Sequence, residues 1–126
     1  MLNKVVAAAL GALLSFAVAA EVDVSGVDTF LMQDMDASAK ELEPLIGARN
    51  APAAAKAVTF LNDGLKWTES YFAAQGAGDA AQFARDGQQR AAAVLRALSG
   101  NDFAGAATAA RALTKTCRAC HDVYRP

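Results

Sequence analysis

Residues 102–124, DFAGAATAARALTKTCRACHDVY, are the stretch that decides the fold. Apolar and small side chains recur in it every three or four positions, which is the period of one face of an α-helix. The members of this stripe are Phe103, Ala106, Ala110, Leu113, Cys117, Cys120 and Tyr124. The stretch therefore predicts a helix over about residues 102–123 with both cysteines on its core-facing side.

Three further stretches upstream carry the same helical period and are separated by Gly, Pro and Asn. We expect helices over residues 27–46, from Pro52 to a break at residues 76–78, and from there to a turn at residues 99–101. Asp79 is the expected N-cap of the third helix. The predicted buried faces are Met32, Met35, Ala39, Leu42 and Ile46 in the first helix; Val58, Leu61, Leu65, Thr68 and Phe72 in the second; and Phe83, Gly87, Ala91, Val94 and Leu98 in the third.

No stretch alternates at the period of a β-strand. Four helices joined by short connections predict an all-α fold, namely an antiparallel up-down-up-down four-helix bundle with a ligand site in its core. In such a bundle the first helix runs antiparallel to the fourth. Met32, near the start of the first helix, and His121, near the end of the fourth, are therefore expected at the same end.

The string Cys117-Arg118-Ala119-Cys120-His121 is the attachment signature of a covalent c-type haem. On a helix the two cysteines lie one turn apart on one face, with the histidine beside them, so two thiols can bond to the haem vinyl groups while the imidazole binds iron. The chain has no other cysteine or histidine. A thioredoxin-like dithiol is expected near a strand–helix junction, and a zinc site needs more ligands. We therefore predict one covalent haem c.

The N-terminus has the pattern of a secretory signal. A short basic start is followed by the apolar residues 5–20, which end in small side chains. The apolar run is shorter than the roughly 20 residues of a membrane span, so residues 1–20 are predicted to be cleaved, leaving no stable membrane anchor and one domain at residues 21–126. The expected location is the periplasm. With 12 basic and 13 acidic side chains, nothing indicates nucleic-acid binding.

Residues 115–125, KTCRACHDVYR, resemble the end of the fourth helix in class II c-type cytochromes, the cytochrome c′ family. The resemblance implies that Cys117 and Cys120 carry the thioether bonds, that His121 is the proximal iron ligand, and that Arg125 lies near the proximal side of the haem. The chain departs from the family pattern at Asp28, where family members commonly have an arginine shortly before the distal position. Many members dimerise, which leaves a homodimer open.

Met32 is either the sixth iron ligand or part of the core, since a helical methionine often fills gaps between other side chains. The low-spin branch of the family uses a methionine at about this place. Met35 lies one turn, about 4.5 Å, deeper along the helix. Trp67 either lies against the porphyrin or is a partly buried packing residue.

The function expected from these features is that of a periplasmic electron carrier, which exchanges electrons with redox partner proteins and has His121 and Met32 as axial ligands. One alternative is a five-coordinate, cytochrome c′-like protein that binds NO or CO. An alternative of another class is a haem-free thiol-disulfide protein. An enzyme is not expected, because no second histidine or acid-base pair accompanies the iron.

Overall fold

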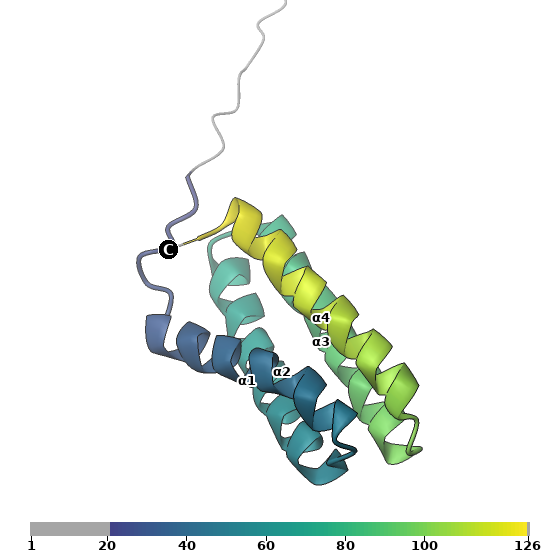
Figure 1. The fold of residues 1–126 in the computed structure, drawn as a ribbon. Helices are drawn as coiled ribbons and strands as arrows, with labels where there is room; N and C mark the ends of the chain where they lie inside the picture. The colour runs from purple at the N-terminus through teal and green to yellow at the C-terminus, as the bar shows by residue number, and fades with distance from the viewer. Residues whose placement is uncertain (1–20, 126) are drawn as a thin grey trace, which may run out of the picture.

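Four α-helices make up the fold of residues 21–125, the part of the chain that the computed structural model describes (Figure 1). They are α1 (Thr29–Gly47), α2 (Ala51–Ala74), α3 (Gly78–Ser99) and α4 (Phe103–Val123). The predicted signal peptide, residues 1–20, lies outside the described residues, as does Pro126. No helix within the described range is long and apolar enough to cross a membrane.

Each helix packs against its neighbours in the chain, and α1 also contacts α4, which closes the ring of helices. Successive helices run in opposite directions (Figure 1), so the prediction of an all-helical fold with four helices is confirmed. The contact between α1 and α4 is the smallest of the four. The two helices lie close together where α1 ends and α4 begins, and they diverge towards the other end.

Side-chain caps set the starts of three helices. Asp28 accepts a hydrogen bond from the Leu31 amide at 3.0 Å, so α1 begins at Thr29 and not at residue 27 as predicted. Asn50 and Asp102 cap α2 and α4 in the same way. The predicted cap of α3 is wrong: Ala77 is the N-cap and makes no side-chain hydrogen bond, while Asp79 lies in the first turn.

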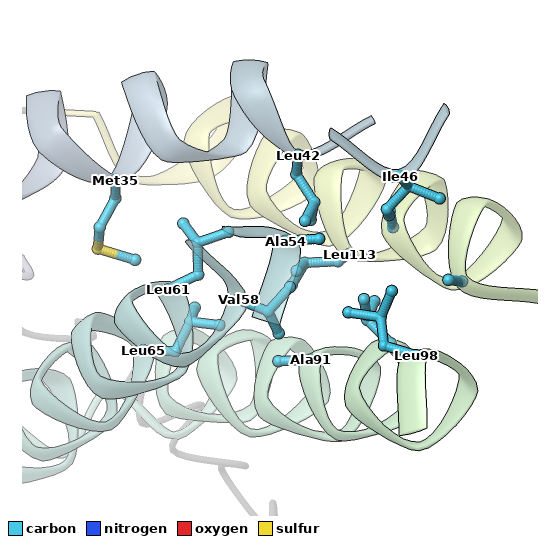
Figure 2. Packing of buried hydrophobic residues seen from close by; sticks show 13 residues of the cluster. Met35, Leu42, Ile46, Ala54, Val58, Leu61, Leu65, Ala91, Leu98 and Leu113 are labelled. Carbon is cyan, nitrogen blue, oxygen red and sulfur yellow. The ribbon is translucent and has the colours of Figure 1, made fainter. Parts of the chain in front are cut away.

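The core consists of two clusters of buried side chains. The larger fills the middle of the bundle and contains most of the predicted stripes (Figure 2). All five predicted positions on α2 are buried. The smaller cluster, which contains Val27, Phe72, Ala77, Ala80 and Ala81, closes the end of the bundle near the C-terminus of α2 and the N-terminus of α3. Most predicted inner positions are buried, whereas seven are half-buried: Met32, Ala39, Phe83, Phe103, Cys117, Cys120 and Tyr124.

The segment before α1 is tied to the C-terminal part of α2. Tyr71 Oη donates to the Asp23 carbonyl oxygen at 2.7 Å, and Gln75 exchanges two hydrogen bonds of 2.9 Å with the backbone of Asp23. Val27 is buried against Phe72 in the smaller cluster. The segment therefore covers the end of the bundle at which α1 begins and α4 ends.

Candidate haem site

The last turns of α4 carry the three residues of the haem signature. The helix continues to Val123, and the backbone turns extended at Tyr124, whose amide donates to the Cys120 carbonyl oxygen at 2.8 Å. Cys117 and Cys120 are partly buried and unpaired. Cys117, Cys120 and the exposed His121 all border one cavity, so the structure brings these predicted site residues together on one wall.

This cavity has a volume of about 900 Å³ and is bordered by all four helices and by Val24 and Val27. The walls supplied by α2 and α3 are uncharged and consist of Leu61, Leu65, Thr68, Phe72, Phe83 and Ala84. The Thr68 hydroxyl is satisfied, since it donates to the Gly64 carbonyl oxygen at 2.8 Å. Among the described residues no buried side-chain nitrogen or oxygen lacks a hydrogen-bond partner. The deep part of the cavity thus suits an apolar group.

The two thiols are held in their protonated form. Burial, together with the nearby Cys117 and Asp79, raises the pKa of Cys120 to about 11. Burial also raises the pKa of Cys117, although Arg118 opposes the shift. A dithiol that exchanges disulfides needs the opposite environment, one that lowers the pKa and stabilises the thiolate. Both cysteines are therefore protonated at neutral pH.

Two methionines of α1 border the same cavity as the haem signature. Met35 is only 7% exposed, and its sulfur lies against Gly64, where α2 has no side chain. Figure 2 shows its side chain leaving α1 towards the layer of Leu61 and Leu65. Met32 is half-buried and contacts both core clusters. Met35 therefore has a packing partner for its sulfur, whereas Met32 lies closer to the end of the bundle that holds His121.

Tyr124 and Asp79 form a contact at this end that the sequence did not reveal. Tyr124 Oη donates to both carboxylate oxygens of Asp79, at 2.8 and 2.7 Å, and the Tyr124 ring packs against Phe72 with the ring centroids 5.5 Å apart. The hydrogen bond lowers the pKa of Asp79 and raises that of Tyr124. The residue predicted as a helix cap instead joins the start of α3 to the turn after Cys120 and His121.

Two other residues singled out from the sequence lie outside the cavity lining. Arg125 follows α4 as an exposed side chain. Trp67 is 37% exposed and stacks on Tyr71, with the ring centroids 5.3 Å apart. The interpretation of Trp67 as a packing residue is consistent with this position.

Residues that the sequence analysis did not assign to the site also border the cavity. Val24 and Val27 come from the segment before α1, and Phe83 and Ala84 come from α3. Hydrophobic periodicity placed Phe83 on the inner face, but it could not show which inner positions border a cavity. No local sequence pattern could have predicted that Val24 borders the cavity. Its position depends on the hydrogen bonds that Tyr71 and Gln75, far away in the sequence, donate to the Asp23 carbonyl oxygen.

No group of three or more His, Cys, Asp or Glu side chains within residues 21–125 is arranged to hold a metal ion. A haem iron does not need such a group, because the porphyrin supplies the equatorial nitrogens and the protein supplies only the axial ligands. Comparisons with protein-family models, curated proteins and solved structures found no match for this chain.

Proposed function

We propose that the protein is a periplasmic c-type cytochrome that carries electrons through one covalently attached haem, with His121 and Met32 as axial ligands. One observation carries the proposal: Cys117, Cys120, His121 and Met32 of α1 all border one cavity whose walls from α2 and α3 are uncharged. The resemblance of residues 115–125 to the class II c-type cytochromes points to the same function.

The thiols supply the covalent link. Each S–H would add across one vinyl C=C bond: the S–H bond and the π bond would break, one C–S bond and one C–H bond would form, and no oxidant would be consumed. The reaction needs two reduced cysteines, and both are unpaired here. A spacing of one helical turn directs both sulfurs to the same side of α4. The turn that presents them also presents His121, so attachment and ligation use a single rigid element.

When bound, the haem would supply one-electron redox chemistry. The protein would set the reduction potential of the haem and limit the access of water to it. A methionine sulfur as second axial ligand raises the reduction potential, and the uncharged walls of α2 and α3 keep water from the ring. The pKa values of the cysteines, raised by burial, disfavour the thiol-disulfide alternative.

Acid-acetone extraction of the purified, exported protein tests the covalent link. We expect the colour to stay with the protein, and we expect Cys117→Ser and Cys120→Ser each to lower the yield of coloured protein sharply. Thr114→Ser is the matched control, because Thr114 also borders the cavity and is on α4 but carries no thiol. Colour that moves into the solvent from the unaltered protein would refute covalent attachment.

Met32→Ala distinguishes the electron carrier from a gas-binding protein. If Met32 binds iron, the ferric protein is low-spin with a weak long-wavelength charge-transfer band, and CO binds slowly because the iron–sulfur bond must break first. The variant should be high-spin, bind CO quickly and have a lower reduction potential. Met35→Ala serves as control and should leave the spectrum unchanged. A high-spin unaltered protein would favour the five-coordinate alternative, and a spectrum that changes only with Met35 would move the ligand one turn deeper.

A further inference from the structure

The charged side chains that border the cavity stand on only two of its walls. The walls from α2, α3 and the segment before α1 contribute no charge. The charged and titratable groups on α1 are Asp36, Lys40 and Glu43, and those on α4 are Arg111, Lys115, Arg118, Cys117, Cys120, His121 and Tyr124. The Asp, Glu, Lys and Arg side chains in this set are exposed. The cavity therefore has a charged, hydrated mouth between α1 and α4.

An ion pair shows which residues of the two helices lie opposite one another across this mouth. Arg111 lies 3.9 Å from Glu43. Because α1 and α4 are antiparallel, one turn from this pair towards the C-terminus of α4 leads to Lys40 on α1 and to Lys115 on α4. One further turn leads to Asp36 and Arg118, whose charges both act on the pKa of Cys117, although burial is the main cause of its shift. Lys40 thus faces the turn of α4 that carries Arg111 and Lys115.

Lys40, Arg111 and Lys115 have weak ion-pair partners or none among the described residues. Lys40 pairs with Asp36 on its own helix, and Arg111 pairs with Glu43 at the limit of ion-pair distance, in both cases between exposed side chains. Lys115 has no ion-pair partner within residues 21–125. Exposed pairs of this kind contribute little, and like charges that face one another are unfavourable. An anion between the three side chains would be stabilised.

We propose that Lys40, Arg111 and Lys115 form an anion site at the mouth of the cavity that binds the propionate carboxylates of the haem, an inference that rests on the proposed function. A haem carries its propionates on the edge opposite the vinyl groups that bond to Cys117 and Cys120. Arg111 stands six residues before Cys117, a rise of about 9 Å along α4, which allows a rigid ring attached at the cysteines to reach these cations with its far edge.

The physical reason is that a carboxylate is costly to bury without a partner. The uncharged walls of α2 and α3 offer none, whereas the mouth offers both water and positive charge. Taken together, the four Lys and Arg side chains and the two Asp and Glu side chains of the mouth leave two positive charges in excess. This excess matches the charge of the two ionised propionates.

The test is a spectroelectrochemical titration of the haem-loaded protein, in which the reduction potential is measured as a function of pH. The triple variant Lys40→Gln/Arg111→Gln/Lys115→Gln is compared with the control Lys56→Gln/Lys66→Gln/Arg90→Gln, which removes the same charge from exposed positions that do not border the cavity. We expect the inflection due to the propionic acids to move up by about one pH unit in the triple variant. The potential at neutral pH should fall, because lost positive charge disfavours the reduced state.

The control should leave the curve unchanged. An inflection that does not move in the triple variant, or that moves equally in the control, would overturn the anion site while leaving the haem protein intact. An unaltered protein without covalent haem would instead refute the proposed function, so the two failures are distinguishable.

Discussion

The contact between Met35 and Gly64 allows a stability prediction to be worked from the structure. A Cβ added to Gly64 would overlap the Met35 sulfur and would lie 2.9 Å from its terminal methyl carbon and 3.0 Å from its Cγ. Met35 is buried, so its side chain cannot swing outward freely. Overpacking of this kind costs about 1–3 kcal/mol, whereas replacing a helical glycine by alanine returns about 1 kcal/mol. We therefore expect Gly64→Ala to lower the free energy of unfolding by about 0–2 kcal/mol.

The effect of Gly64→Ala on the free energy of unfolding should change sign once Met35 is replaced by alanine. Met35→Ala alone should lower the free energy of unfolding by an amount near the upper end of the usual range of about 2–5 kcal/mol. The reason is that Gly64 has no side chain that could fill the void. In this background the new alanine at position 64 meets no sulfur and keeps its advantage in helix propensity. Gly64→Ala should then raise stability by about 1 kcal/mol, which gives a coupling between the two substitutions of about 1–3 kcal/mol.

Equilibrium urea denaturation of the four proteins of this double-mutant cycle, followed by far-ultraviolet circular dichroism, measures the coupling. Gly78→Ala is the matched control, because it also lies in a helix but has open space around its added Cβ. Its effect should be the same with Met35 and with alanine at position 35. An equal effect of Gly64→Ala in the two backgrounds would refute the reasoning, since it would mean that the sulfur does not occupy the space at Gly64.

Three further outcomes are expected. Tyr124→Phe should reduce the pH dependence of stability in acid and in alkali. The lowered pKa of Asp79 stabilises the fold above pH 3.8, its ordinary pKa, and this stabilisation is lost as the carboxylate is protonated in acid. The raised pKa of Tyr124 stabilises the fold below pH 10.0, its ordinary pKa, and this stabilisation is lost as the hydroxyl ionises in alkali. Thermal melts across the pH range check this, and a variant with the unaltered profile would contradict it. Asp102→Ala should cost about 1 kcal/mol in urea denaturation, because it removes the cap of α4 at Gly105; an unchanged midpoint would show that the cap contributes nothing. His121→Ala should lose the normal haem spectrum and accept added imidazole, whereas an unaltered spectrum would show that another group holds the iron.

The helices and their inner faces were predictable because they depend on local spacing. Val58, Leu61, Leu65, Thr68 and Phe72 recur at the helical period, and each is buried where the pattern placed it. The connection at residues 99–101 was predictable for a similar reason, since glycine and asparagine tolerate turn conformations; Asn101 has a φ of 54°. The prediction for Asp79 was wrong because capping preference is only a local signal, and the distant Tyr124 competes for the same carboxylate.

The helical content, the order of the four helices and the Cys-x-x-Cys-His signature could be read from the sequence, because each depends on residues close together in the chain. The tertiary structure was needed to show that α1 diverges from α4, that Val24, Val27 and Phe83 border the resulting cavity, and that Lys40, Arg111 and Lys115 border the same cavity from two different helices. These features depend on the register and separation of helices distant in sequence. Hydrophobic periodicity predicts which face of a helix is buried, but it does not predict the distance to the helix opposite.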